Sequence, residues 1–551
     1  MRAINTLRTI FVAILKDSGF DWPEKTVIEP PRDPKFGDLS INAAMLLAKT
    51  ARANPRELAL KFAGQLLERC PDVEKAEVAG PGFCNVTFTN EFWRRTALAV
   101  ESAGDAYGRS DIGQGRKILL EYVSANPTGP LHVGHGRGAA VGDSLARLLR
   151  KAGYGVDTEY YINDAGNQMR MLGLSVWLRV LELAGRGVSW PDDYYRGGYI
   201  VDIAQKMLDD DPTLPDCPEA EGQNRCYTRA VNEILSGIRA DLHNFRVGHD
   251  RWFSEKTLVQ KNAVEDAFTA LTAAGHTFTE DKAFWFATEK FGDDRNRVLK
   301  KSDGSLTYFA TDIAYHRDKF QRGYDRLIDV WGADHHGYIP RIRAAITAMG
   351  RPVESFDVVL IQLVNLLQNG KPVSMSTRAG TFETLAQVIQ EVGVDAARFM
   401  FLSRKSDSPL DFDLELVKQR TMDNPVYYVQ YAHARICAVL RRADESGIAL
   451  AHPATEDMLA SLDTPEDIAL LRKADAFEDT VCAAARSLSP HYVSHYLMEL
   501  AGLLHSYYAK HQVLLPDDMP RTVSRAVLLR AVRQILRNGL EILGVDAPDA
   551  M

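Results

Sequence analysis

The sequence predicts an α/β protein built around an open, Rossmann-like parallel sheet, and three observations support this class. The apolar run 118–120 is typical of a buried strand, and a glycine-rich loop, an amphipathic helix and a second strand at 156–161 follow it. Two more apolar runs of this kind occur at 326–332 and 357–362. Strands separated by helical stretches are expected to pair in parallel and to bind ligands at their carboxyl ends. From residue 414 onward the pattern is helical.

Three domains are expected, because 551 residues exceed what one hydrophobic core usually organises. We place an α+β domain at 1–112, the sheet domain at 113–413 and an α-helical bundle at 414–551. A helix-rich insertion is expected to interrupt the sheet domain at about 170–290. In the bundle, helices are predicted at 416–443, 464–487, 490–511 and 521–543.

The chain begins with a segment that fits two interpretations. Its apolar residues, from Ile4 to Leu15, alternate with Arg and Lys, as they do in an organelle presequence. The same spacing suits an amphipathic helix that ends at Asp17 and Gly19. We predict the helix, as the first element of the N-terminal domain.

Composition limits the function classes. A hydrophobic content of 46% and a charged content of 25% are those of an ordinary globular protein, and no apolar run reaches membrane-spanning length. The net charge of −8 argues against a generally basic, DNA-coating protein, although a local basic patch for RNA is compatible with it. None of the six cysteines belongs to a C-x-x-C pair, which is typical of reduced thiols. We therefore expect a cytoplasmic protein with no DNA or membrane partner.

The segment 121–136, E-Y-V-S-A-N-P-T-G-P-L-H-V-G-H-G, joins the first strand to its helix and carries the most specific signal in the chain. His132 and His135 flank Gly134 at the helix N-terminus, where free backbone N–H groups favour anions. Two imidazoles can donate to phosphate oxygens, and a residue without a Cβ lets a flat base approach. The segment therefore predicts a nucleotide site that differs from the P-loop and G-x-G-x-x-G types.

His-Val-Gly-His resembles the H-I-G-H signature of class I aminoacyl-tRNA synthetases. With the preceding Glu121 and Asn126, the segment is similar to that of the arginyl-tRNA synthetase family. The resemblance extends over nearly the whole chain. It includes 31–49 in the N-terminal domain, 195–199 and 251–255 in the insertion, and 424–435 and 543–551 in the bundle, which resembles an anticodon-binding domain.

This resemblance implies an arginine–tRNA ligase. Such an enzyme forms arginyl-adenylate from ATP and L-arginine, and then transfers the arginyl group to the terminal adenosine of tRNA(Arg), expected at its 2′-OH. The resemblance also implies that bound tRNA is needed for the first step. It further implies that Mg²⁺ accompanies ATP without a dedicated protein metal site, and that the protein is a monomer.

The resemblance assigns the nucleotide site to two segments. His132 and His135 are expected to act on the phosphates and Gly134 to lie against the adenine, while the segment 331–338 closes the site. The residues expected to bind ATP are Asn126, Pro127, Thr128, Gly129, Pro130, Leu131, His132, Val133, Gly134, His135, Gly136, Gly332 and Asp334.

Free arginine needs a pocket with a well-placed carboxylate, because a guanidinium is planar, permanently charged and matched by carboxylates. Tyr308 and Asp312 stand four residues apart, on one face if the stretch is helical. Alternatively, Asp312 pairs with Arg317 or Arg322 on the surface and Tyr308 belongs to the core. The resemblance favours the pocket and gives its residues as Glu121, Ser124, Asn126, His135, Tyr308, Asp312 and His336, with His335 as the alternative to His336.

Class I enzymes carry a second signature, K-M-S-K-S, whose lysines steady the pyrophosphate leaving group. The matching segment 371–380 has Ser374 and Thr377 in place of both lysines. The residues of this segment expected to act in catalysis are Ser374, Met375, Ser376 and Arg378. Because charge builds on the leaving phosphates, other cations are expected to substitute, and the candidates are Lys371, Arg378, Lys300, Lys301 and Arg137.

Contacts with tRNA are predicted in the first and last domains. Single-stranded bases stack on aromatic rings and phosphates pair with basic side chains, and the bundle interleaves both residue types. Most tyrosines at helical spacing belong to a core, so few are selected. The predicted contacts are Arg32, Lys35 and Phe36 in the N-terminal domain, and Tyr431, Arg435, Tyr508 and Met551 in the bundle.

Two other functions stay open from the sequence. A class I synthetase for a different amino acid is expected to lack the Tyr308 and Asp312 pair and the N-terminal domain. A catalytically silent relative that only binds tRNA is suggested by the missing lysines alone. The intact His132, Gly134 and His135 argue against a silent protein.

Overall fold

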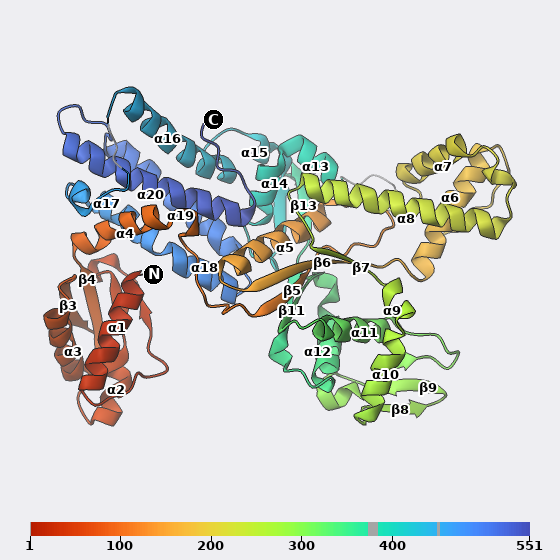
Figure 1. The fold of residues 1–551 in the computed structure, drawn as a ribbon, viewed down its shortest axis with the longest axis horizontal. Helices are drawn as coiled ribbons and strands as arrows, with labels where there is room; N and C mark the ends of the chain where they lie inside the picture. The colour runs from red at the N-terminus through yellow and green to blue at the C-terminus, as the bar shows by residue number, and fades with distance from the viewer. Residues whose placement is uncertain (1, 373–383, 449–451) are drawn as a thin grey trace.

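The computed structural model describes residues 2–372, 384–448 and 452–551. Its centre is a five-stranded sheet in the order β12-β11-β5-β6-β7, in which every neighbouring pair is parallel (Figure 1). The predicted α/β class is therefore confirmed. The strands are β5 (Lys117–Glu121), β6 (Gly155–Ile162), β7 (Arg251–Ser254), β11 (Arg326–Gly332) and β12 (Phe356–Ile361).

The order of this sheet reverses at β5. The chain runs outward from β5 through β6 to β7, and then returns to the other side of β5 to add β11 and β12. At such a reversal the connections leave the sheet on opposite faces, so a crevice opens at the carboxyl ends of the two central strands. A ligand is therefore expected between β5 and β11.

Two helices frame this crevice. α5 (Val133–Lys151) follows β5 and buries Val141, Leu145 and Leu148 at helical spacing. α11 (Tyr308–Gln321) precedes β11 and packs against α10 (Ala263–Ala273) and α12 (Ile339–Ala348). Both helices therefore bring a terminus or a face to the same edge of the sheet.

The predicted insertion at about 170–290 has no strand in its first part, whereas its second part contains both helices and strands. In the first part, α6 (Asn167–Leu183), α7 (Gly198–Asp210) and α8 (Glu219–Asn244) form an arm at the right of Figure 1. The second part contains β7, a strand of the central sheet, and two further strands, β8 and β9, of which β9 pairs antiparallel with both β8 and β10. These strands have four residues each, too few for a periodicity to show. The remaining elements are α9 (Lys256–Gln260), β8 (Thr277–Glu280), β9 (Ala283–Phe286) and β10 (Arg297–Lys300).

The N-terminal domain is an antiparallel sheet, in the order β1-β2-β4-β3, packed with helices. Its first helix, α1 (Arg2–Asp17), buries Leu7, Phe11 and Ile14, each no more than 1% exposed, which confirms the predicted amphipathic helix. The other elements are β1 (Ile28–Glu29), β2 (Leu39–Ile41), α2 (Ala43–Ala51), α3 (Pro55–Arg69), β3 (Val73–Ala79), β4 (Phe83–Phe88) and α4 (Asn90–Ala103).

A small sheet, in the order β14-β13-β15, and three short helices lead from the sheet domain to the bundle. Two predicted bundle helices, 490–511 and 521–543, correspond closely to α19 and α20. The elements are β13 (Val364–Gln368), β14 (Lys371–Pro372), α13 (Leu385–Val392), α14 (Val394–Phe401), β15 (Leu410–Asp413) and α15 (Leu414–Lys418), then α16 (Pro425–Glu445), α17 (Pro465–Asp475), α18 (Phe477–Arg486), α19 (His491–Lys510) and α20 (Met519–Leu543).

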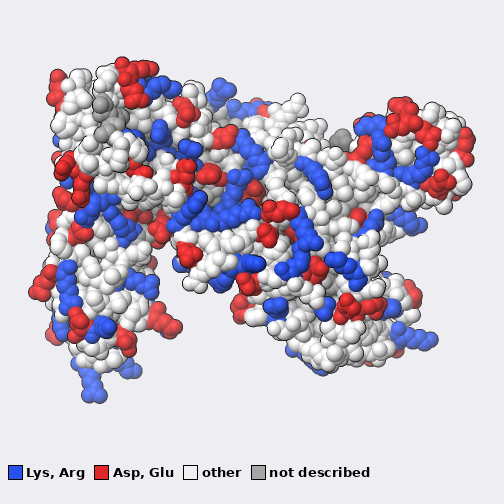
Figure 2. Space-filling model, in the orientation of Figure 1, with Lys and Arg blue, Asp and Glu red and all other residues white. Residues whose placement is uncertain are grey.

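The surface combines both signs of charge. In Figure 2, Lys and Arg gather in a band across the middle of the face, over the region of α5, α18 and α19 in Figure 1. An acidic chain therefore has a local basic surface, as RNA binding requires. Within the described ranges, no helix has the length and apolar character needed to cross a bilayer. All six cysteines are free thiols, and five of them are buried.

Candidate functional site

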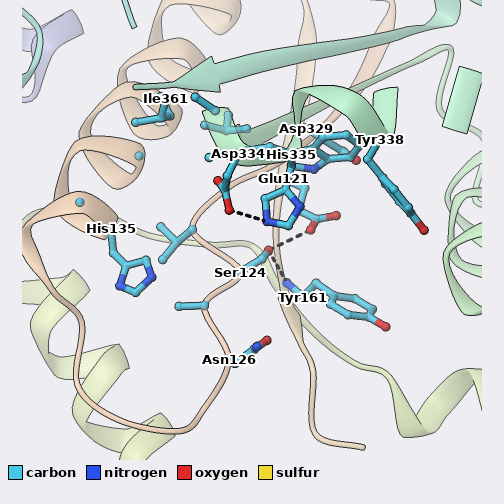
Figure 3. A pocket seen from close by; sticks show the side chains of 18 of the residues that line it. Glu121, Ser124, Asn126, His135, Tyr161, Asp329, Asp334, His335, Tyr338 and Ile361 are labelled. Atoms are coloured by element: carbon cyan, nitrogen blue, oxygen red, sulfur yellow. Dashed lines mark hydrogen bonds and ion pairs between the residues drawn. The ribbon is translucent and has the colours of Figure 1, made fainter. Parts of the chain in front are cut away.

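A cavity of about 1120 Å³ opens at the carboxyl ends of β5 and β11, where the sheet order predicts it (Figure 3). Its walls come from the loop after β5, the start of α5, one side of α11 and the turn Ala333–Tyr338 after β11. Two distant sequence signals, the segment 121–136 and Asp312, therefore meet in one place. The predicted residues that line the cavity are Glu121, Ser124, Asn126, His132, Val133, Gly134, His135, Asp312, Gly332 and Asp334.

His132 and His135 cap the start of α5 with one nitrogen each. Nδ1 of His132 accepts hydrogen bonds from the backbone N–H groups of Gly134 (3.1 Å) and His135 (3.4 Å), and Nδ1 of His135 accepts from the N–H of His132 (3.3 Å). The two rings stack with their centroids 3.7 Å apart. A neutral imidazole nitrogen that accepts carries no proton, so each ring has its proton on Nε2.

This capping changes the source of anion binding. The N–H groups of Gly134 and His135, expected to be free, are already bonded to His132. Burial lowers the pKa of both imidazoles, and burial together with His132 lowers that of His135 to about 3, so both rings are neutral near pH 7. The helix start therefore offers a phosphate its two Nε2–H groups rather than these two backbone amides.

Glycines at the start of α5 serve two different purposes. A Cβ on Gly134 would lie 3.0 Å from Cε1 of His132, so the stacked ring leaves no room for a side chain. A Cβ on Gly136 would lie 2.6 Å from a methyl group of Leu385. Gly136 and the fully buried Leu131 thus face the core, outside the cavity lining, although both were expected at the nucleotide.

The loop before α5 is held by the inserted arm. The amide nitrogen of Asn126 donates to Oε1 of Gln168 on α6 (2.8 Å), and the hydroxyl of Tyr199 on α7 donates to the carbonyl of Thr128 (2.5 Å). Asn126 lines the cavity from this position. The expected nucleotide contacts Pro127, Thr128, Gly129 and Pro130 lie outside the cavity lining.

A strained turn follows β5. Val123 and Ser124 have φ values of 69° and 41°. Such left-handed values cost a residue with a side chain about 1–3 kcal/mol each. The hydroxyl of Ser124 holds the turn, because it accepts from the N–H of Tyr161 (3.0 Å) and donates to Oε1 of Glu121 (2.9 Å; dashed lines in Figure 3). Ser124 thus fixes the side chain of Glu121.

Glu121 belongs to a buried charge network that the sequence did not reveal. Its Oε2 accepts from Nζ of the fully buried Lys319 (2.5 Å), which also donates to Oδ1 of Asp329 (2.9 Å). The other oxygen of Asp329 lies 3.1 Å from Nε2 of His316. Burial raises the pKa of Glu121, and the charge of Lys319 opposes this rise. Burial also acts to raise the pKa of Asp329, but Lys319 and His316 outweigh it and lower that pKa to about 2.

Asp312 lines the opposite side of the cavity and accepts a hydrogen bond from the hydroxyl of Tyr338 (2.5 Å). Burial raises the pKa of Asp312. Burial, followed by the charges of Asp312 and Asp164, also raises the pKa of Glu255 to about 7. Carboxylates whose charge is poorly compensated form a place for a cation. Glu255 gave no signal in the sequence beyond its place in the segment 251–255.

Tyr308 and Asp312 lie one turn apart on α11, but only Asp312 lines the cavity. Tyr308 is the first residue of α11 and is 70% exposed. The alternative ion pair of Asp312 with Arg322 does not form, because the guanidinium of Arg322 bonds to both carboxylate oxygens of Glu159 (2.6 and 2.8 Å).

The turn after β11 separates the two candidate histidines. His335 lines the cavity, with its Nε2 3.5 Å from a carboxylate oxygen of Asp334, whereas His336 is exposed and lies outside the lining. The structure therefore places the alternative, His335, at the pocket, and not the selected His336. Gly332 also lines the cavity, and a Cβ there would lie 2.4 Å from Oδ1 of Asp334.

Among the cations proposed for the leaving group, Lys371, Lys300, Lys301 and Arg137 belong to the described residues. Ser374, Met375, Ser376, Thr377 and Arg378 lie outside the described residues. Lys371 in β14 and Lys301 are exposed, and Lys300 at the end of β10 is partly exposed.

The prediction that Arg137 offers a cation to the phosphates is wrong. The side chain of Arg137 is fully buried, and its guanidinium donates to the carbonyls of Gln362 (2.9 Å), Ser408 (2.8 Å) and Lys405 (2.9 Å). Because these acceptors engage both terminal nitrogens, Arg137 anchors α5 to the neighbouring loops instead of facing the cavity.

The residues predicted to contact tRNA lie at two distant surfaces. Arg32, Lys35 and Phe36 are exposed, with the ammonium of Lys35 over the ring of Phe36 (4.9 Å) and 2.8 Å from Asp33. In the bundle, the ring of Tyr431 stacks with those of Tyr427 and His505, the guanidinium of Arg435 lies 4.3 Å from the ring centroid of Tyr508, and Met551 is 55% exposed.

A His–Cys–Asp group lies where the C-terminal tail meets α16. Suitable ligand atoms of His433, Cys437 and Asp549 lie within 4.8 Å of one another. Nδ1 of His433 is 2.9 Å from the carbonyl of Pro548, which only accepts, so this nitrogen carries a proton. The thiol of Cys437 donates to Asp549 (3.4 Å). These bonds fasten the tail to the bundle.

Comparison with known proteins covers every domain. Family models match residues 5–88 (Arginyl tRNA synthetase N terminal domain), 99–182 with 221–430 (tRNA synthetases class I (R), catalytic domain) and 429–551 (DALR anticodon binding domain). The arginine–tRNA ligases of Desulfovibrio desulfuricans and Nitratidesulfovibrio vulgaris (strain Miyazaki F) are 73% and 61% identical to the chain, each over all of both chains.

Solved structures agree with these matches. A putative arginyl-tRNA synthetase from Campylobacter jejuni is 34% identical, with a TM-score of 0.77 over 84% of this chain and all of that one. The Thermus thermophilus arginyl-tRNA synthetase matches in fold, with a TM-score of 0.76 over 99% of this chain and all of that one at 24% identity. A methionyl-tRNA synthetase from Mycobacterium tuberculosis reaches only 0.54 over 78% of this chain and 91% of that one at 13% identity, a likeness of fold alone. The chain therefore belongs to the arginyl-tRNA synthetase family.

Proposed function

We propose that this arginine–tRNA ligase binds ATP across the start of α5 and arginine between Glu121 and Asp312, in one continuous cavity. The observation that carries the proposal is the meeting of two neutral Nε2–H donors and poorly compensated buried carboxylates within about 1120 Å³. Phosphates need hydrogen-bond donors, and the two cationic groups of arginine need carboxylates. The histidine donors and Asp312 lie on opposite sides of the cavity, which supports binding of both substrates.

In the first step, a carboxylate oxygen of arginine attacks the α-phosphorus of ATP. The bond from that phosphorus to the bridging oxygen breaks, and pyrophosphate leaves with the electron pair. Nε2–H groups of His132 and His135 stabilise the charge that develops on the phosphate oxygens, and Gly134 leaves room for the adenine. No side chain is required as a covalent nucleophile, so positioning and electrostatics supply the catalysis.

Arginine is selected by its two cationic ends. Asp312, with Glu255 behind it, faces the guanidinium, and Glu121, held by Ser124, faces the α-ammonium. Asn126 and His335 lie on the same cavity and complete the arginine contacts. A neutral amino acid lacks the first of these attractions and leaves buried carboxylates unpaired, which disfavours its binding.

In the second step, a hydroxyl of the terminal adenosine of tRNA(Arg), the 2′-OH in class I, attacks the arginyl carbonyl and releases AMP. The contacts of Gln168 and Tyr199 with the loop before α5 connect the inserted arm to the nucleotide site. They support the expectation that bound tRNA is needed even for the first step. Arg32, Lys35, Phe36, Tyr431, Arg435, Tyr508 and Met551 are proposed as tRNA contacts.

Mg²⁺ is proposed to arrive with ATP and to offset part of the phosphate charge. The four carboxylates that line the cavity have other partners: Glu121 has Lys319 and Ser124, Asp329 has Lys319 and His316, Asp312 has Tyr338, and Asp334 has His335 at 3.5 Å. The ion is therefore assigned to the nucleotide rather than to a protein site. We place the protein in the cytoplasm, as a monomer.

The proposal is tested by charging total tRNA with each radiolabelled amino acid in turn, together with ATP–pyrophosphate exchange. We expect charging with arginine alone, and exchange that depends on both arginine and tRNA. Charging with another amino acid at a comparable rate contradicts the proposed selection by carboxylates.

A further inference from the structure

Three acidic residues form a row across the central sheet. In the strand register, Asp329 of β11 pairs with Glu121 of β5, and Glu121 pairs with Glu159 of β6. Neighbouring strands lie about 4.8 Å apart, so these carboxylates crowd one another on one face. Asp329 and Glu159 are no more than 1% exposed and Glu121 is 8% exposed. Such a row needs cations to stay charged.

α11 and its C-cap residue supply those cations, from positions three residues apart. Lys319 donates to Glu121 and Asp329, whereas Arg322 binds Glu159 with both terminal nitrogens. The two pairs differ in location: Glu121 and Asp329 line the cavity, and Glu159 does not. Lys319 itself does not line the cavity, so a bound substrate meets Glu121 and not the lysine behind it.

We propose that Lys319 is a positioning residue for arginine, which keeps Glu121 charged and aimed at the α-amino end of the substrate. This inference rests on the proposed contact of Glu121 with arginine. With Lys319 on Oε2 and Ser124 on Oε1, both oxygens of Glu121 have a fixed partner, and its side chain has one orientation. The ammonium also permits two neighbouring carboxylates to be charged at once.

Loss of the lysine has a predicted signature in pH. Lys319→Met leaves Glu121 beside the two carboxylates Asp329 and Glu159 without the ammonium that offsets their charge. The other titratable groups nearby are His316, which contacts Asp329, Tyr315, which donates to Glu159, and Asp312 on α11. The pKa of Glu121 is therefore expected to rise, so that Glu121 takes up a proton more readily. Arginine then loses a charged partner below the new pKa. We expect the KM for arginine near pH 7 to rise about tenfold or more and to recover toward pH 8.5, while the KM for ATP changes little.

The matched control is Arg322→Met. It removes a second cation of the same acidic row, a partly buried one at the C-terminal cap of α11, which serves a carboxylate outside the cavity. We expect a loss of thermal stability without a change in the KM for arginine or its pH profile. Lys319→Arg keeps the charge and is expected to restore part of the arginine affinity at pH 7.

Glu121→Gln separates the inference from the proposed function beneath it. We expect Glu121→Gln to raise the KM for arginine, and Lys319→Met to add little in the double variant. If Glu121→Gln leaves the KM for arginine unchanged, Glu121 does not contact arginine, and the proposed role of Lys319 is excluded as well. If Glu121→Gln raises the KM for arginine but Lys319→Met keeps the parental KM at every pH, the role of Lys319 is contradicted while the proposed function stands.

Should Lys319→Met fail to fold, Asp329→Asn decides the question with the lysine in place. Removing the neighbouring negative charge favours the charged form of Glu121. The acid limb of the arginine KM profile is then expected to move to lower pH. A shift in the other direction, or no shift, contradicts the inference.

Discussion

Each histidine of the signature pair uses its two nitrogens for different purposes. Nδ1 caps the helix, and the proposed phosphate contact uses Nε2–H, so the cap and the proposed chemistry depend on the same ring. Substitutions can separate the two roles. His135→Asn keeps an acceptor near Nδ1 and loses the distal donor, whereas His135→Gln keeps a distal donor and loses the local acceptor.

For His135→Asn we expect arginine- and tRNA-dependent ATP turnover to fall by about 10²–10³, as for loss of a donor aimed at developing charge. Thermal stability is expected to stay close to the parental value. His135→Gln is expected to retain more turnover but to lose about 0.5–2 kcal/mol of stability with the cap. Parental turnover in His135→Asn would remove that residue from the phosphate site.

Asp312 gives a prediction for the guanidinium pocket. Asp312→Asn keeps the shape and the bond with Tyr338 but removes the charge, so the KM for arginine is expected to rise by the equivalent of about 1.5–3 kcal/mol. The KM for ATP is the internal control. Unchanged arginine dependence means that the guanidinium lies elsewhere.

The raised pKa of Glu255, about 7, predicts a pH dependence. A carboxyl group with a raised pKa is neutral below that value and charged above it, so the attraction for arginine increases as the pH rises through 7. We expect kcat/KM for arginine to rise between pH 6 and 8, and Glu255→Gln to flatten the rise. A profile that Glu255→Gln leaves unaltered contradicts this role.

At the scale of elements, the strands of the central sheet were predictable because each is a short apolar run. β11 has the predicted bounds 326–332, and β5, β6 and β12 differ from their predictions by a residue or two at their ends. The long bundle helices α19 and α20 were predictable from their spacing.

Two helix breaks were not predicted, for different reasons. The predicted helix 416–443 is interrupted between α15 and α16, where Asn424 caps the new helix and Pro425 occupies its first position, signals that the sequence does contain. The predicted helix 464–487 divides into α17 and α18 at Ala476, and alanine is not a residue that breaks helices. The residue after the break, Phe477, is fully buried, so its packing is not visible in the local pattern.

The site was predictable where a motif is local and not where it depends on tertiary contacts. The segment 121–136 was selected from residue type and spacing, whereas Asp312 was assigned to the pocket through the family resemblance; both contribute to the cavity lining. Lys319 lies 198 residues from Glu121, and no local pattern connects them. Arg137 was misassigned because charge in a sequence does not indicate burial.

Arg137 tests the anchoring of α5. Arg137→Met leaves three buried carbonyls without their donor, and we expect a loss of about 2–4 kcal/mol in the free energy of unfolding. The KM for ATP is expected to change little. A large rise in that KM at unchanged stability supports the phosphate role that the structure argues against.

At the scale of the molecule, one buried arginine joins the catalytic helix to the end of the bundle. The guanidinium of Arg398 bonds to Asp143 of α5 (2.5 Å), to the carbonyl of Leu543 at the end of α20 (2.9 Å) and to that of Phe245 (3.0 Å). It is fully buried. The sheet domain and the bundle are therefore expected to unfold together.

Arg398→Met is expected to cost about 3–5 kcal/mol, because it leaves Asp143 without its buried partner. The matched control is Arg147→Met, which removes a more exposed arginine from the same carboxylate oxygen and is expected to cost about 0.2–1 kcal/mol. Denaturant unfolding followed by circular dichroism measures both. Equal losses in the two variants contradict the role given to the junction.

The most direct measurement is a crystal structure with a non-hydrolysable ATP analogue, arginine and tRNA. We expect phosphate oxygens within hydrogen-bond distance of Nε2 of His132 and His135, and the guanidinium within reach of Asp312. Nucleotide or arginine density remote from the carboxyl ends of β5 and β11 would contradict the site proposed for both substrates.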